Sequence, residues 1–386
     1  MGASKRIFES ELIERKIKFN KIIKKIINIL PYDYNFEIIE NYIKKFYFFD
    51  YKELCDFKEY YDKKNKFLIK IKKKSRYEMP EISFLLKNLP IVKCLLKKET
   101  KEKYQKNYCE SESKKLYSQF EKERENKNKK RYEKLSKAQE LVQQVEPEFL
   151  DKLMGIYFRK NTSQENRMYL FSEVEKYYCQ KTVDFFRKVH DTEYNNQLRE
   201  RAFLRLQEWG HYIRLRKGKY IVIKTKNKKR REFIKKIYKN QLTSLKCTPK
   251  ELEKRIEESL DQRIKSYDYF ISHSSKNSSL VKEIKEIFNA DNKNIYCDWI
   301  SDNHYLKRTL ISEATKIVIN KRMEQSKELI FVDTPEARNS LWVKYELNYF
   351  YNLKKKMYVW NEKINSTEPM KDYWYVDNDY KNMKLF

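Results

Sequence analysis

The chain contains little glycine and little proline, with four and seven of these residues among 386. It has no Gly-rich phosphate-binding loop, no His-Glu-x-x-His motif and no Gly-x-Ser-x-Gly nucleophile elbow. These absences argue against P-loop NTPases, zinc proteases of the common type and α/β-hydrolases.

Histidine and cysteine are also sparse, with four and six residues, and no two cysteines form a C-x-x-C pair. This dispersion argues against a zinc site and against a disulfide framework, so we expect reduced thiols and a cytoplasmic protein. We expect neither a metal nor a cofactor.

The chain has no apolar run long enough for a membrane span, and its first residues lack the apolar stretch of a signal peptide. Arg6 stands where a myristoylation signal needs Ser or Thr. We therefore expect no membrane partner.

Acidic residues are too few to balance the basic ones, and the formal net charge is +30. Residues 267–386 carry 19 Lys and Arg against 17 Asp and Glu, so almost all of the excess precedes them. Such asymmetry suggests a polyanionic partner, with nucleic acid the first choice. The alternative is codon bias, because the abundant residues (Lys, Ile, Asn, Tyr and Phe) are those of a low-GC genome.

The first 145 residues indicate helices. Apolar residues recur at helical spacing over residues 5–30, and Pro31 ends that pattern. Residues 35–98 are predicted to be mostly helical. In residues 112–134, 14 of 23 side chains are charged, which is typical of a solvated helix or linker.

A compact helical segment and a basic hairpin follow. Gly210 is placed to end the last helix, and Lys217-Gly218 is placed to turn the hairpin between His211–Arg216 and Lys219–Lys224. Twelve basic residues and one acidic residue lie in 214–236. Helices that precede a basic hairpin are weakly analogous to a winged helix, which would bind nucleic acid. The alternative to nucleic-acid binding is that these basic residues form a solvated surface. The side chains predicted to contact nucleic acid are Arg214, Arg216, Lys219, Lys228, Arg230 and Arg231.

The remaining residues alternate between strand and helix. Thr248-Pro249-Lys250-Glu251 predicts a helix that begins there and runs to about Lys265. The pattern after it, β-α-β-α-β-α-β, predicts a parallel sheet with helices on both faces. The expected strands are Tyr267–Ser272, Asn294–Trp299, Glu328–Val332 and Met357–Trp360. The expected helices are Ser279–Phe288, Leu310–Met323 and Leu341–Leu353.

The fold class predicted is α+β multidomain, with a mostly α-helical N-terminal region, a small basic β-hairpin and a C-terminal α/β domain. The predicted parts are a helical region (1–110), a charged helical linker (111–145), a basic helical and hairpin domain (146–247), a connector helix (248–266) and the α/β domain (267–386).

Three motifs in the last part occur in order at domain-like spacing. They are Tyr267-Asp268-x-Phe270-Ile271-Ser272-His273-Ser274, then Tyr296-x-Asp298-Trp299-Ile300, then Ser340-x-Trp342-x-x-x-Glu346-Leu347. Together they resemble a bacterial Toll/interleukin-1 receptor (TIR) domain of the NAD-hydrolase type, with a flavodoxin-like parallel sheet. The resemblance covers about residues 267–360.

The resemblance implies cleavage of NAD⁺ into nicotinamide and ADP-ribose or a cyclic form, with NAD⁺ as substrate and no further cofactor. It implies that Glu346 is catalytic, and Trp342 shares its helix face at i, i+4. It also implies self-association of TIR domains and a role in anti-phage defence, switched on by partner-triggered assembly. The implied substrate-binding residues are Phe270, Ser272, His273, Ser274, Asp298, Trp299, Ile300 and Trp342.

Each assignment has an alternative. Trp342 and Trp299 fit equally into a hydrophobic core, Glu346 fits a surface helix, and His273 fits a loop satisfied by backbone contacts. For the whole chain, the alternatives are a non-catalytic TIR scaffold and a nucleic-acid-binding regulatory protein.

Overall fold

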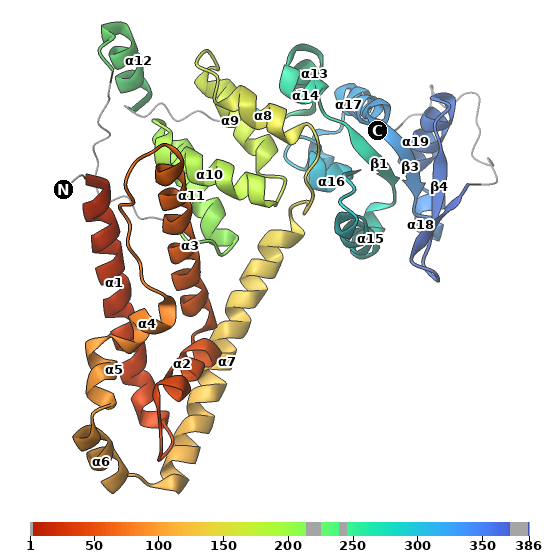
Figure 1. The fold of residues 1–386 in the computed structure, drawn as a ribbon. Helices are drawn as coiled ribbons and strands as arrows, with labels where there is room; N and C mark the ends of the chain where they lie inside the picture. The colour runs from red at the N-terminus through yellow and green to blue at the C-terminus, as the bar shows by residue number, and fades with distance from the viewer. Residues whose placement is uncertain (1–2, 214–224, 239–244, 371–384, 386) are drawn as a thin grey trace. The chain divides into compact units, whose positions relative to one another are not determined.

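The structure is a computed structural model that describes residues 3–213, 225–238, 245–370 and 385. The chain divides into two compact units, shown in Figure 1. The first unit comprises residues 1–136 and 207–218, and the second comprises residues 137–206 and 219–386. The two units are coarser than the five parts drawn from the sequence, whose boundaries stay a prediction.

The first unit is helical, as predicted. Its core collects the apolar stripe of α1, including Phe19, Ile23 and Ile26, against the aromatic and aliphatic side chains of the next helices. Pro90 begins a helix here, since it occupies the first helical position of α5. The helices are α1 (Ala3–Ile26), α2 (Phe36–Phe46), α3 (Phe48–Lys70), α4 (Ile82–Lys87), α5 (Pro90–Leu95), α6 (Lys98–Lys106) and α7 (Glu110–Glu140).

The charged segment forms the long helix α7, which buries none of its residues fully. One side of it nevertheless packs on other helices of the first unit: Phe120 meets Phe46 edge to face, and the Arg124 guanidinium lies 3.9 Å from the ring centre of Tyr47. The prediction of a solvated helix is therefore confirmed, although one side of α7 contacts neighbouring helices.

The predicted hairpin lies outside the described residues, apart from His211–Ile213, which form no strand. Within that short stretch Tyr212 is buried in the core of the first unit. Its hydroxyl donates to the buried carboxylate of Glu11 at 2.9 Å, which also accepts from Tyr61 at 2.7 Å. Gly210 has a φ of +75°, and a Cβ there would lie 2.9 Å from a Leu135 methyl group. Both the positive φ and the close Leu135 methyl group favour glycine at that position.

The second unit begins with helices and continues into a five-stranded sheet. Ser163 caps α9 by accepting from the Asn166 amide at 3.2 Å. The predicted connector helix is interrupted at Ser259, whose backbone is extended (φ −102°, ψ 129°). The helices are α8 (Leu150–Tyr157), α9 (Gln164–Val174), α10 (Gln180–Thr192), α11 (Asn196–Glu208), α12 (Lys228–Tyr238), α13 (Pro249–Glu258) and α14 (Leu260–Arg263).

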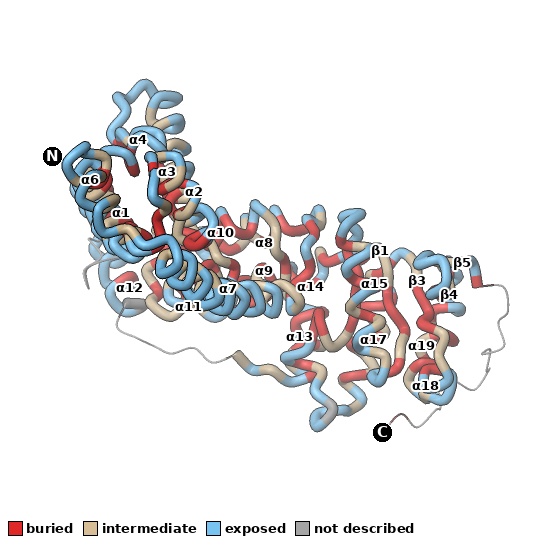
Figure 2. Tube along the Cα trace, turned by 90° about the horizontal axis from the view of Figure 1, so that it is seen from below, coloured by how far each residue is buried: buried red, intermediate tan, exposed pale blue. Residues whose placement is uncertain are grey.

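The sheet has the strand order β2-β1-β3-β4-β5. The first four strands are parallel and β5 is antiparallel to β4. Helix α15 covers one face, while α17 and α19 cover the other (Figure 1), and the buried strand residues lie between them (Figure 2). The strands are β1 (Tyr267–Ser272), β2 (Ile295–Tyr296), β3 (Ser326–Phe331), β4 (Met357–Asn361) and β5 (Ser366–Pro369); the helices are α15 (Ser278–Ala290), α16 (Asp298–Ser301), α17 (Glu313–Gln325), α18 (Pro335–Arg338) and α19 (Leu341–Asn352).

The second strand is shorter than predicted. Hydrogen bonding of β2 stops at Tyr296, and the next residues form the short helix α16, which has Asp298 in its first turn. An acidic side chain is favoured at a helix N-terminus, and Trp299 of this helix also bonds His273, 26 residues earlier in the chain. The antiparallel β5 was not predicted at all, because Ser366–Pro369 is polar and mostly exposed.

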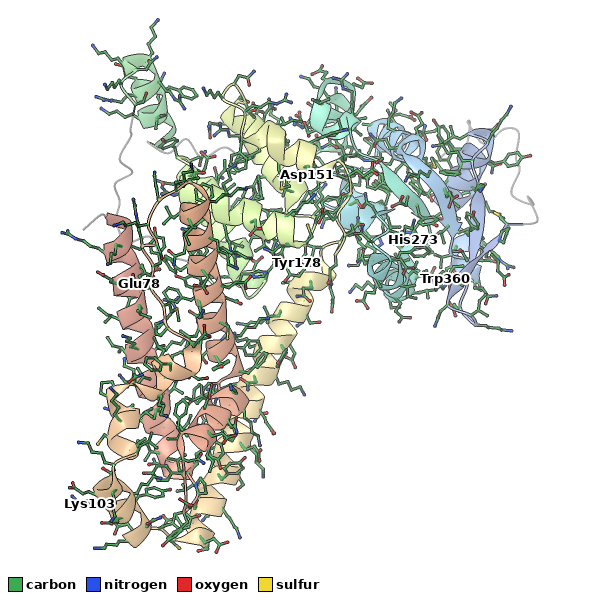
Figure 3. All side chains as sticks on the ribbon, viewed as in Figure 1. Glu78, Lys103, Asp151, Tyr178, His273 and Trp360 are labelled. Carbon is green, nitrogen blue, oxygen red and sulfur yellow. The ribbon has the colours of Figure 1, made fainter. Side chains whose placement is uncertain are left out.

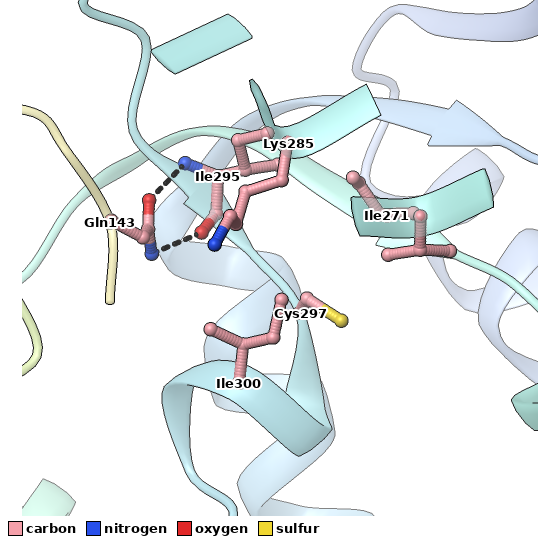
Figure 4. A pocket seen from close by; sticks show the side chains of 7 residues that line it. Gln143, Ile271, Lys285, Ile295, Cys297 and Ile300 are labelled. Atoms are coloured by element: carbon pink, nitrogen blue, oxygen red, sulfur yellow. Dashed lines mark hydrogen bonds between the residues drawn. The ribbon is translucent and has the colours of Figure 1, made fainter. Parts of the chain in front are cut away.

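One edge of the sheet is covered by a side chain. The Gln143 amide donates to the Ile295 carbonyl at 2.7 Å and accepts from the Ile295 N–H at 3.1 Å, as Figure 4 shows. Nearby, the Lys285 ammonium donates to the carbonyls of Glu140 at 2.6 Å and Val142 at 3.0 Å. The segment after α7 is thereby held to β2 and α15.

Candidate active site

The candidate site lies at the carboxyl end of β1. Strand alternation places Ser272 on the same face as Phe270, toward α19, while Ile271 faces α15. On α19, Glu346 stands three residues after buried Val343 and four before buried Phe350, so it faces the sheet. The Ser272 hydroxyl donates to Glu346 Oε2 at 2.6 Å. Ligands of open α/β sheets bind at this end of the strands.

The Glu346 carboxyl is in an environment that disfavours its charge. Burial raises its pKa to about 8, the Ser272 hydrogen bond opposes this, and the negative charge of Asp298 adds to the rise. The residue as a whole is only partly buried, so its carboxyl is desolvated yet within reach of a ligand. A carboxyl with a strongly shifted pKa at a strand end is a candidate catalytic group.

His273 joins β1 to α16. Its Nδ1 lies 3.2 Å from the Ile271 carbonyl, and its Nε2 accepts from the Trp299 indole N–H at 2.9 Å. Because the indole can only donate, Nε2 carries no proton, and Nδ1–H donates to the carbonyl. Only 6% of the His273 side chain is exposed. Both ring nitrogens are used inside the protein, so this histidine positions α16.

Three potential metal ligands meet beside this histidine. His273 Nε2, Cys297 Sγ and Asp298 Oδ1 lie 4.0 Å from one another. The imidazole lone pair is already used by Trp299, and burial raises the pKa of the Cys297 thiol well above its usual value. Because Trp299 already occupies the imidazole lone pair, we assign these residues to packing and hydrogen bonding.

The other predicted residues differ in position. Phe270 and Ile300 are buried in the cores on opposite faces of the sheet. The Ser274 hydroxyl accepts from the Lys276 amide at 3.4 Å and so caps a short 3₁₀ turn. Trp342 is partly buried and meets Tyr345 edge to face. The structure thus brings Ser272, His273, Asp298, Trp299 and Glu346 together and places Phe270 and Ile300 beneath them. Figure 3 labels His273 among the side chains of the second unit.

The structure describes only three of the six residues predicted to contact nucleic acid. Lys228, Arg230 and Arg231 are exposed on α12, and Arg231 donates to the Thr225 carbonyl at 3.0 Å. Arg214, Arg216 and Lys219 lie outside the described residues. Nucleic-acid binding stays a prediction.

Similarity to known proteins fits this geometry. A family profile described as "Thoeris protein ThsB, TIR-like domain" matches residues 270–365. A Cytobacillus dafuensis protein named "Putative cyclic ADP-D-ribose synthase TIR2" is 38% identical over 93% of this chain and 92% of its own length. The chain belongs to this bacterial TIR family. The identity extends through the first unit as well as the TIR domain, so the relative shares both parts.

A second relative matches the TIR domain alone. The Bacillus cereus (strain MSX-D12) protein named "Probable 3' cyclic ADP-D-ribose synthase ThsB'" is 33% identical over 25% of this chain and 49% of its own length. No solved structure matches the chain significantly. Among the described helices, none is both long enough and apolar enough to cross a bilayer.

Two residues near the TIR site were missed by sequence reasoning. Cys297 is buried against His273, and Asp302, which is fully buried, ends α16. Asp302 follows the predicted second strand in a polar stretch of the sequence, and no local pattern distinguishes a buried aspartate from a solvated one. Its partners lie 126 and 20 residues away, at Lys176 and Arg322.

Proposed function

We propose that this TIR protein cleaves NAD⁺ between nicotinamide and ribose, with Glu346 as the catalytic carboxylate, and joins the ADP-ribose into a cyclic product. The observation that carries the proposal is the desolvated carboxyl of Glu346 at the carboxyl end of β1, bonded to Ser272. The two curated relatives, both named as cyclic ADP-D-ribose synthases, support the cyclic outcome.

The chemistry suits a single carboxylate. Cleavage passes through an oxocarbenium-like ribose, as in glycoside hydrolysis. Nicotinamide leaves as a neutral base from a cationic pyridinium, so no general acid is needed. A carboxylate near the ribose stabilises the positive charge as it develops. The cationic substrate itself favours ionised Glu346 when it binds, since an opposite charge lowers a carboxyl pKa.

The direct test is to incubate the full-length protein with NAD⁺, at several protein concentrations and with or without added nucleic acid. The products are separated by chromatography. We expect nicotinamide together with a cyclic isomer of ADP-ribose. Linear ADP-ribose as the sole second product would contradict cyclisation, and an absence of nicotinamide under every condition would contradict the activity.

A pH profile tests the state of Glu346. If the carboxylate is the active form, kcat/KM for NAD⁺ should rise about tenfold per pH unit below the free-enzyme pKa of about 8 and level off above it. Ser272→Ala removes the hydrogen bond that lowers this pKa, so the rising limb should move to higher pH. A profile that falls with pH, or one that Ser272→Ala leaves in place, would contradict the assignment.

We also propose that the protein acts in the cytoplasm, on NAD⁺ as its substrate and without a further cofactor, and that TIR domains self-associate when a partner activates them. The unpaired state of all six cysteines supports a reducing compartment. Family membership supports assembly, and the basic residues exposed on α12 make nucleic acid the first activator to try.

A further inference from the structure

A cluster of buried charges joins the helices of residues 137–206 to the TIR domain within the second unit. Arg322 and Asp302 have no exposed surface, and Glu173 and Lys265 are almost fully buried. Only Lys176 reaches the surface, with 14% of its side chain exposed. Buried charges are costly unless they are paired.

Every charge in this cluster has a partner. Arg322 donates to Asp302 at 2.8 Å and to Gln262 at 2.7 Å. Lys176 contacts both Glu173 at 2.8 Å and Asp302 at 3.2 Å. Lys265 completes the group, 2.5 Å from Glu173. Lys176 is thus the side chain from the helical region that reaches the TIR carboxylate directly.

The cations of this cluster hold its two carboxylates in their ionised forms, whereas burial and the charges of Lys176 and Arg322 lower the pKa of Lys265 to about 8. Burial would raise the pKa of Glu173, but Lys176 and Lys265 lower it to about 2. Burial would likewise raise the pKa of Asp302, but Arg322 and Lys176 hold it well below its usual range. Both carboxylates therefore stay negative at neutral pH and bind their cations continuously.

Asp302 stands at the end of α16 and organises the backbone around it. Its N–H donates to the Asp298 carbonyl at 3.0 Å, and its own carbonyl accepts from the Tyr305 and Leu306 amides at 2.9 Å. Tyr305 in turn packs in a buried cluster with Tyr169 of α9. Two independent contacts from the helical region therefore reach the segment that follows the active-site residues.

We propose that Lys176, in the turn after α9 and outside the matched TIR segment, is a positioning residue that sets α16 in the active site through its contact with Asp302. The path is short. Asp302, the partner of Lys176, directly follows the four residues of α16. On that helix, Trp299 bonds His273. The residue before His273 is Ser272, which bonds Glu346. The claim about catalysis rests on the proposed NAD⁺ cleavage.

The test compares three variants of the full-length protein. Lys176→Met keeps the aliphatic stem and removes the charge, Lys176→Arg restores a charge, and Lys181→Met is the matched control. Lys181 also makes two ion pairs, with Glu146 and Asp151 at 2.6 Å, but it does not contact Asp302. Circular dichroism gives the folded fraction, to which each rate of nicotinamide release is normalised.

We expect kcat/KM per folded molecule to fall about tenfold in Lys176→Met, since small displacements of site residues have effects of this size or larger. Lys176→Arg should recover most of the loss, and Lys181→Met should match the wild type. Amide hydrogen exchange over residues 298–306, which needs no activity, should be faster in Lys176→Met alone.

A Lys176→Met protein that matches Lys181→Met in both rate and exchange would overturn the proposal. Should it not fold, Lys176→Gln takes its place in the same comparison. A wild type that releases no nicotinamide would instead defeat the proposed function, while the exchange measurement would still decide whether Lys176 holds α16.

Discussion

Glu346→Gln should reduce nicotinamide release from NAD⁺ by roughly 100-fold or more, since an uncharged amide cannot stabilise the positive ribose of the transition state. Glutamine has nearly the same shape and can still accept a hydrogen bond from Ser272, so the site geometry is kept. The loss should appear in kcat more than in KM, because the charge acts on the transition state. Initial rates at saturating NAD⁺ measure it.

The stability of the same variant separates catalysis from folding. A raised folded-state pKa means that folded protein binds a proton at Glu346 that unfolded chain has lost, so the unfolding free energy falls as pH rises from about 4.5 to about 8. Glutamine does not ionise, so Glu346→Gln should be at least as stable as the wild type at pH 8. Equal activity in the variant, or a clear loss of stability there, would refute this account of Glu346.

Arg322→Met should destabilise the second unit by about 3–5 kcal/mol, which is typical when one partner of a buried ion pair is removed. Methionine replaces the apolar stem of the side chain but leaves Asp302 and the Gln262 side-chain carbonyl without their guanidinium partner. For a unit of this size the loss corresponds to a midpoint lowered by about 10 °C. Thermal unfolding followed by circular dichroism would measure it.

The adjacent residue supplies the control. Lys321 lies on the same helix and pairs with Glu324 at 3.1 Å, but both side chains are well exposed. Lys321→Met should therefore change stability by about 1 kcal/mol or less. Equal midpoints for the two variants would show that the buried cluster contributes no more than a surface pair.

The local sequence pattern was sufficient to predict much of the secondary structure of the TIR domain. Strand β1 and helix α19 begin at the predicted residues, because a dense β-rich run and a Ser340 cap mark them without reference to the rest of the chain. The third motif contains Glu346, whose catalytic role stays a prediction, and the structure places this residue beside Ser272. The predicted TIR family was confirmed by the relatives.

The features that could not be predicted from the sequence depend on contacts between residues far apart in the chain. Asn294–Trp299 resembles a strand, but Trp299 turns onto α16, where it bonds a histidine 26 residues earlier. The helix expected to connect two parts instead packs within the second unit, where Leu252 and Ile256 lie in one cluster with Tyr305 and Val318. A single sequence shows the apolar face of such a helix but not the surface that buries it.

The Gln143 amide also determines how TIR domains can meet. A strand from another molecule could extend the sheet at β2 only by bonding the N–H and C=O of Ile295, and Gln143 already occupies both. An open sheet edge is a common route to unwanted aggregation, and a buried side-chain amide closes it here. Copies of this protein that assemble must therefore use surfaces other than Ile295 on β2. Displacing Gln143 would expose the N–H and C=O of Ile295 at that edge.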